Sequence, residues 1–184
     1  MRTFKHILQI IIITLTITVN AQALKLNEKQ SELSWTGKAA FNSYSLTGSI
    51  KVKEGAIEIK DNTLLSLVIV IDMKSLNHEN SDLKSHLKNK DFFEVNAFPV
   101  ATFKLSKPVI INNNEAILIG QMTIKNISKE ETIKVLIINN TITLNHSIDR
   151  TSYGVKFNSP SFFKKMKENA IADEFAINGK LYFE

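Results

Sequence analysis

Apolar and polar residues alternate along most of this chain, and a two-residue period is typical of antiparallel β-strands that bury one face. In the first such segment, 31–41, the apolar parity comprises Leu33, Trp35, Gly37, Ala39 and Phe41. Further strands are predicted at 46–53, 56–59, 64–73, 101–111, 116–125, 131–138, 141–148 and 173–184, with a turn at Glu54-Gly55. The pattern therefore predicts an all-β domain.

The segment 64–73 is the most apolar of these strands. Its two parities are Leu65, Leu67, Ile69, Ile71 and Met73 on one face and Leu64, Val68 and Val70 on the other. A buried helix is the alternative interpretation, but branched residues dominate the run and the helical period is missing. We therefore expect a strand with both faces covered.

Two short helices are predicted between the strands. The first has Ser81 as its expected N-cap and Asp82 in its first turn, and its apolar stripe is only Leu83 and Leu87. So narrow a stripe does not stabilise a free helix, so this one must dock on the sheet. The second should run from Ser159-Pro160 through about Glu168. Three aromatic residues are expected beneath the first helix, either lining a ligand entrance or forming local core: Phe92, Phe93 and Phe98.

Short polar turns connect the predicted strands, and consecutive hairpins indicate an up-and-down topology. Asn112–Asn114 forms one such turn and 126–129 another, because Asn tolerates the left-handed conformation. About eight antiparallel strands avoid open edges most simply by closing into a barrel. We expect one domain, 24–184, folded as an antiparallel barrel with one or two short capping helices.

Residues 1–23 do not fit this barrel. A basic start with Arg2 and Lys5 precedes the apolar run 7–19 and the small-residue exit Ala21-Gln22-Ala23. This is the pattern of a secretory signal peptide, because a run of about 13 residues is shorter than the roughly 20 that span a bilayer. We expect cleavage after Ala21 or Ala23 and a periplasmic or secreted protein.

Amino-acid composition and net charge limit the kinds of bond and binding partner that this protein can have. Cysteine is absent, which excludes disulfides, thiolate metal sites and a cysteine nucleophile. Without residues 1–23, 21 basic residues stand against 18 acidic ones, so the net charge falls from +5 to +3. The lysine pairs on the predicted helices are interpreted as solvated faces rather than as a nucleic-acid site. Transient contact with an anionic membrane surface stays open, as does a homodimer.

Candidate chemistry is sparse in this sequence. His78, His86 and His146 lack the spacing of metal ligands, so no metal is assigned. The G-x-S-x-G motif and phosphate-binding glycine loops are missing, which disfavours a hydrolase or a nucleotide-dependent enzyme. Asp149-Arg150 is interpreted as a structural ion pair that holds a loop, with an acid/base role as the alternative.

Motifs spread over residues 31–175 resemble one known family. They are Ser31–Trp35, Leu46–Gly48, Ile71-Asp72, Asp82-Leu83, Asp91–Val95, Phe98-Pro99, Gly120–Ile124, Ile148–Arg150, Tyr153-Gly154 and Asp173–Phe175. In these motifs the chain resembles the YceI-like family of secreted lipid-binding or polyisoprenoid-binding proteins. The resemblance implies a lipocalin-like barrel of eight strands, with a long apolar tunnel that the helical segment closes at one end. It brings no catalytic residues. Two positions depart from the family pattern, Phe41-Asn42 in place of a histidine and Asn126 in place of a glycine.

Candidate ligand contacts are assigned by strand parity and by position beneath the helix, not by the resemblance. They are Trp35, Phe41, Leu67, Ile69, Ile71, Phe92, Phe93, Phe98, Phe103, Leu105, Leu118, Met122, Ile124, Phe175 and Ile177. Large residues on the inward parity would fill the barrel, while small ones would leave a lane for a slender ligand. The sequence leaves both interiors open.

The leading functional hypothesis is non-enzymatic binding, carriage or storage of a long apolar molecule, such as an isoprenoid quinone or a polyprenyl lipid, with no cofactor required. Micromolar binding requires a free energy of roughly 8 kcal/mol, and burying about ten to fifteen carbons, at about 0.8 kcal/mol each, supplies it. One alternative is an enzyme that acts on such a lipid, with Asp72, His86 or Asp149 as acid or base. The other is a solid barrel that serves as an interaction module.

Overall fold

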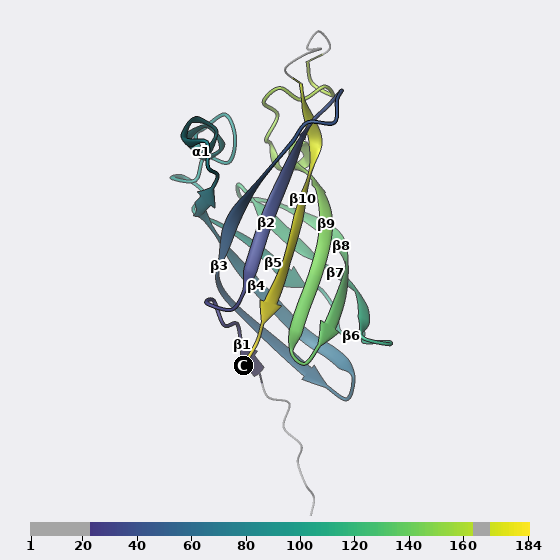
Figure 1. Cartoon of the computed structure of the whole chain (residues 1–184). Helices are drawn as coiled ribbons and strands as arrows, with labels where there is room; N and C mark the ends of the chain where they lie inside the picture. Colours follow the sequence, from purple (N-terminus) through teal and green to yellow (C-terminus); the bar gives the residue numbers. More distant parts are fainter. Residues whose placement is uncertain (1–22, 164–169) are drawn as a thin grey trace, which may run out of the picture.

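Eight long strands form a closed antiparallel barrel in the computed structural model, which describes residues 23–163 and 170–184 (Figure 1). They are β2 (Glu32–Ala39), β3 (Ser45–Lys60), β4 (Thr63–Asn77), β5 (Val100–Leu105), β7 (Glu115–Ile124), β8 (Ile127–Ile138), β9 (Thr141–Asp149) and β10 (Ile171–Tyr182). Each strand pairs with the next long strand in the chain, and β10 closes the ring on β2. The predicted up-and-down barrel is therefore confirmed.

Four shorter elements complete the described part of the chain. β1 (Ala23–Lys25) pairs with β3, and β6 (Val109–Ile110) pairs with β4. The helix α1 (Ser81–Lys88) follows β4, and the 3-10 helix η1 (Arg150–Tyr153) follows β9. Neither described helix has the length and apolar character needed to cross a lipid bilayer.

Asparagine-rich two-residue turns connect the strands. In four hairpins, two consecutive residues adopt φ between 47° and 64°, a conformation that Asn and Asp tolerate best among residues with a side chain. The pairs are Asp61-Asn62, Asn113-Asn114, Lys125-Asn126 and Asn139-Asn140. The predicted turn at 126–129 lies instead at 125–126, so β8 begins at Ile127.

Two strand boundaries in the sequence analysis are wrong. The Glu54-Gly55 pair does not turn the chain, because β3 runs through it and absorbs one extra residue between Val52 and Glu54 as a bulge. Glycine at position 55 avoids a tight contact there, because a Cβ would lie 3.0 Å from the backbone oxygen of Val68 and 2.9 Å from Ile69 Cδ1. The predicted strand 101–111 is also divided, into β5 and β6, around Pro108.

The strand β4 is covered on one face only, contrary to expectation. Val68 is 38% exposed on the outer wall of the barrel. A register irregularity near Leu65 turns both Leu64 and Leu67 into the interior, which explains why residues of both parities are apolar in this stretch. The high apolar content of β4 therefore reflects a bulge that turns residues of both parities inward, not burial of both faces of the strand.

Helix α1 begins at Ser81, one residue earlier than the predicted cap implied. Asn80, not Ser81, is the N-cap, and its side chain accepts hydrogen bonds from the backbone N–H groups of Asp82 and Leu83, each at 2.9 Å. The start of the predicted second helix, 160–162, is a turn. Its remainder, 164–169, lies outside the described residues, as does the expected signal sequence within 1–22.

Side chains fill one half of the barrel. In the half that faces the turns 61–62, 113–114 and 139–140, the interior is filled by buried side chains that include Ile57, Leu64, Leu67, Leu105, Ala116, Leu118, Val135 and Ile142. The half toward α1 is hollow.

Candidate ligand-binding cavity

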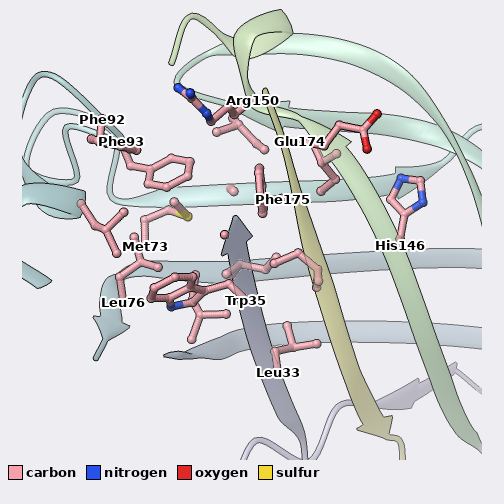
Figure 2. A pocket seen from close by; sticks show the side chains of 18 of the residues that line it. Leu33, Trp35, Met73, Leu76, Phe92, Phe93, His146, Arg150, Glu174 and Phe175 are labelled. Atoms are coloured by element: carbon pink, nitrogen blue, oxygen red, sulfur yellow. The ribbon is translucent and has the colours of Figure 1, made fainter. Parts of the chain in front are cut away.

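A cavity of about 330 Å³ occupies the barrel half toward α1 (Figure 2). Every long strand of the barrel contributes to its wall, and α1 with the residues that follow it adds the side nearest β4. The lining is almost entirely apolar. Its volume lies at the lower end of the range of about 300–1,000 Å³ typical of ligand pockets.

Trp35 forms one wall of the cavity and is the only tryptophan of the chain. Its ring lies against Gly48 of β3, where a Cβ would collide with the indole and with the backbone oxygen of Asn77. Its ring centroid is 5.8 Å from that of His78. Glycine at position 48 therefore lets the indole lie flat along β3, so the intrinsic fluorescence of the protein reports on this cavity.

The cap of the cavity is the segment 81–98, which begins with α1. Leu83 and Leu87 of the helix line the cavity together with Phe92 and Phe93. Phe93 makes an edge contact with Phe175 of β10, at a centroid distance of 6.0 Å. The apolar stripe of α1 thus docks on the barrel, as the sequence predicted, and Phe92 and Phe93, which follow the helix, line the cavity.

Two lysines fasten this cap to the barrel. Lys88 Nζ donates to the backbone oxygen of Lys74 at 2.6 Å. Lys125 Nζ, in the turn between β7 and β8, donates to the backbone oxygen of Phe92 at 2.8 Å and lies 3.7 Å from the Glu94 carboxylate. The cap is therefore attached at two places, to β4 and to the turn between β7 and β8.

Arg150 is buried beside the cavity and holds the loop between η1 and β10. Its guanidinium donates to three backbone oxygens, those of Val155 (2.8 Å), Ile171 (2.9 Å) and Ala172 (3.0 Å). Burial lowers the pKa of Arg150, and the carboxylates of Asp173 and Asp149 act in the opposite direction. Figure 2 shows the guanidinium turned away from the labelled cavity residues Trp35 and Phe175.

The predicted ion pair between Asp149 and Arg150 has the wrong acidic partner. The carboxylate nearest to Arg150 Nη2 is that of Asp173, at 4.0 Å. Asp149 instead caps η1 and accepts hydrogen bonds from Thr151 and Ser152. Burial alone would raise the pKa of Asp149, but these hydrogen bonds outweigh it and hold the pKa below its ordinary value.

One polar cluster stands inside the barrel. Tyr153 Oη donates to Glu131 Oε1 at 2.7 Å, and His146 Nε2 lies 3.1 Å from Glu131 Oε2. Burial and the hydrogen bond to Glu131 raise the pKa of Tyr153 far above its ordinary value. His146 lines the cavity, as do Lys38, Arg150 and Glu174, so this cluster adds a hydrogen-bonding group to a wall that is mostly apolar.

The structure brings ten of the fifteen candidate contacts to the cavity. These are Trp35, Ile69, Ile71, Phe92, Phe93, Phe103, Met122, Ile124, Phe175 and Ile177. Leu67, Leu105 and Leu118 face inward but belong to the filled half. Phe41 is 65% exposed because β2 ends at Ala39, before the alternation does. Phe98 lies outside the cavity, with its ring 5.8 Å from Lys125 Nζ.

Sequence reasoning missed several lining residues. Leu33, Met73, Ile133, Leu144, His146 and Ile148 all line the cavity. His146 shares the inward parity of β9 with Leu144 and Ile148, so alternation alone could have found it. The acid/base candidates Asp72, His86 and Asp149 do not line the cavity. Within residues 23–163 and 170–184, no group of three or more His, Asp or Glu residues is placed to hold a metal ion.

An eight-stranded antiparallel barrel with an apolar interior defines the class of small barrels that can enclose one slender ligand. The family model of the YceI-like domain matches residues 24–183 of this chain. The chain belongs to the YceI-like family, which confirms the resemblance seen in its motifs.

Individual relatives agree with this assignment. The UPF0312 protein of Staphylococcus aureus strain USA300 is 32% identical over 124 residues, which cover 60% of this chain and 70% of that protein. The structure of BcnA from Burkholderia cenocepacia superposes with a TM-score of 0.71 at 21% identity, covering 85% of this chain and 98% of that one. A polyisoprenoid binding domain from Saccharophagus degradans, implicated in plant cell wall breakdown, gives a TM-score of 0.62 at 13% identity, covering 90% and 99%.

Proposed function

We propose that this protein binds a long apolar molecule of isoprenoid type, such as a quinone or a polyprenyl lipid, and carries or stores it without chemical change. The observation that carries this proposal is the apolar cavity between the barrel and its aromatic cap. The description of a protein with a similar fold as a polyisoprenoid binding domain supports the ligand class.

The size of the cavity limits how the ligand is held. At about 30 Å³ for each small group, 330 Å³ accommodates about eleven groups of methylene size. Their burial contributes about 9 kcal/mol, whereas losing the freedom of the ligand costs at least about 4 kcal/mol. A molecule confined to the cavity therefore binds more weakly than micromolar unless polar contacts add affinity. A longer chain gains more by extending through the cavity mouth.

Exposed aromatic residues beside the cavity mouth support uptake from a lipid surface. Phe41 and Tyr44 lie on the loop between β2 and β3, and Phe162 and Phe163 lie on the neighbouring loop before β10. The two loops are joined by the hydrogen bond from Ala40 N to the backbone oxygen of Ala170, at 2.9 Å.

Basic side chains accompany this aromatic rim. Lys38 and Tyr44 both line the cavity, so the rim is continuous with the apolar interior. Lys156 lies over the Phe162 ring, 4.4 Å from its centroid. Aromatic rings beside lysines suit the boundary of an anionic membrane, so a ligand could pass between bilayer and cavity without crossing water.

The N-terminal pattern of residues 1–23 supports a periplasmic or secreted location, where such a carrier would meet membrane lipids. Intact-mass measurement and N-terminal sequencing of the protein purified from its native cells test this location, because cleavage would leave Gln22 or Leu24 as the first residue. A chain that still begins at Met1 would contradict this location.

Native mass spectrometry of the purified protein, followed by organic extraction, tests ligand binding. We expect an apolar molecule to be released, and added quinones or prenols to change the fluorescence of Trp35. A homogeneous ligand-free species that also refuses added quinones and prenols would overturn the proposed function.

Vesicle sedimentation tests the membrane contact. The double variant Phe41→Ser, Tyr44→Ser should bind anionic vesicles about fivefold more weakly than the unmodified protein, because it removes apolar area from the rim. The matched control is Ile117→Ser, Ile138→Ser, which removes exposed apolar area from the outer wall far from the mouth. Equal losses in the two variants would contradict a specific rim.

A further inference from the structure

The polar cluster of Glu131, His146 and Tyr153 joins three elements, β8, β9 and η1, at the hollow half of the barrel. The backbone ladder between β8 and β9 ends at Val135 and Leu144, although both strands continue beyond these residues. Beyond that pair, toward η1, a side-chain contact between Glu131 and His146 connects the two strands. The contact between His146 and Glu131 therefore has a structural role at this seam, and it engages the Nε2 atom of the ring.

For a neutral His146, the cluster also determines which ring nitrogen carries the proton. An ionised Glu131 carboxylate only accepts hydrogen bonds, so Tyr153 Oη–H and His146 Nε2–H must both donate to it. A neutral imidazole that carries its proton on Nε2 leaves Nδ1 as an acceptor. Within residues 23–163 and 170–184, no hydrogen bond engages His146 Nδ1.

His146 is well placed for a ligand. It lines the cavity, and Figure 2 shows it on the side of the cavity away from Phe92 and Phe93 of the cap. A chain that lies against the cap aromatic residues and Trp35 would place one of its ends near His146. Ligand pockets of this kind are mostly apolar, with a few polar groups that orient the ligand.

We propose that His146 Nδ1 accepts a hydrogen bond from the hydroxyl head group of the ligand, and that Glu131 and Tyr153 hold the ring in the required tautomer. This inference rests on the proposed function and names the class of ligand: a long apolar chain that ends in a hydroxyl, such as a prenol or a hydroquinone. Glu131 and Tyr153 are positioning residues for this contact.

The test compares three ligands with the same chain: a prenol, its methyl ether and the matching hydrocarbon. Their binding to the full protein is measured by the fluorescence of Trp35. The prenol donates a hydrogen bond, and the other two do not. We expect the prenol to bind about five- to tenfold more tightly than the ether, as one hydrogen bond in a dry site implies.

Two variants separate the contact from a purely structural role. His146→Gln keeps an amide near the Nε2 position to bond Glu131 but places no atom at Nδ1, so the preference for the prenol should disappear. Asn145→Gln is the matched control, since Asn145 is exposed on the outer parity of the same strand and does not line the cavity, and it should keep the preference. Circular dichroism checks that both variants fold.

Glu131→Gln gives a readout that packing alone would not change. Its amide oxygen can accept from Tyr153, and its amide N–H then donates to His146 Nε2, which moves the ring proton to Nδ1. Nδ1 becomes a donor, so the variant should favour the methyl ether or a carbonyl-bearing analogue over the prenol.

Each remaining outcome decides against the inference. If the unmodified protein binds none of the three ligands, the proposed function fails and the inference fails with it. If it binds all three equally, the cavity is a binding site but the hydroxyl contact does not exist. A preference that survives in His146→Gln would show that another group contacts the hydroxyl.

Discussion

Asp149 and Arg150 are neighbours in the chain, but their side chains stabilise different parts of the molecule. Asp149 closes the first turn of η1, whereas Arg150 donates to the backbone oxygens of Val155, after η1, and of Ile171 and Ala172, at the start of β10. A buried guanidinium is tolerated because these oxygens replace the water that it loses. The pair sets the position of η1, and η1 carries Tyr153 to Glu131.

Asp149→Ala should lower the free energy of unfolding by about 1 kcal/mol at neutral pH, as the loss of an N-cap does. The folded-state pKa of Asp149 is lowered, so its carboxylate stabilises the fold above the unfolded-state pKa. That contribution is lost as pH falls through the folded-state pKa. Denaturant unfolding at pH 7 and near pH 3 should therefore give a smaller difference between the two proteins at the lower pH. A difference that does not change with pH would contradict this role of the charge.

At the scale of elements, the cap 81–98 is held by three local contacts. Asn80 caps the start of α1, the contact of Lys88 with Lys74 holds α1 beside β4, and Lys125, in the turn after β7, holds Phe92. A helix of eight residues with a narrow apolar stripe has little stability of its own. We therefore expect it to be the element of the cavity wall that opens at the lowest cost.

Asn80→Ala should loosen this cap without changing the cavity. A loss of about 1 kcal/mol at the N-cap corresponds to roughly fivefold more opening, so ligand release should accelerate by a similar factor. Hydrogen exchange should become faster over 81–88 but not in β7 or β8. Asn96→Ala is the control, because Asn96 is exposed in the same segment and caps no helix. Unchanged release in Asn80→Ala would show that the ligand leaves by another route.

At the scale of the whole molecule, the barrel is divided into a filled half and a hollow half. This division reconciles stability with ligand binding, because the filled half buries apolar area whether or not a ligand is present. Ala101 and Ala116 illustrate the two halves. Both are 3% exposed, but Ala101 lines the cavity and Ala116 lies in the filled interior.

The same substitution should therefore have opposite effects at these two positions. Ala101→Phe places a ring in the cavity, so it should abolish ligand binding while thermal stability stays close to that of the unmodified protein. Ala116→Phe forces a ring into filled space, which should cost about 1–3 kcal/mol, and ligand binding should remain. Thermal unfolding and native mass spectrometry measure both effects. Loss of ligand in Ala116→Phe at full stability would refute the division.

The strands, their inward parity and most hairpin turns were determined by the sequence itself, because alternation and left-handed Asn pairs are local properties. Ten of the fifteen candidate contacts followed from parity and from the helix with its aromatic residues. One of the five misses has a local cause, because alternation continued past the end of β2 to Phe41. Leu67, Leu105 and Leu118 have the predicted inward parity but lie in the filled half, which is not a local property.

Only the tertiary structure decided where the barrel is filled and where it is hollow. Leu118 and Met122 share one strand and one parity, yet only Met122 lines the cavity. The surroundings of these two side chains differ because the free space at each height along the barrel axis depends on side chains from all eight strands. Closure of the barrel brings those side chains together. The cluster of Glu131, His146 and Tyr153 has the same origin: positions 15 and 22 residues apart meet only where β8, β9 and η1 converge.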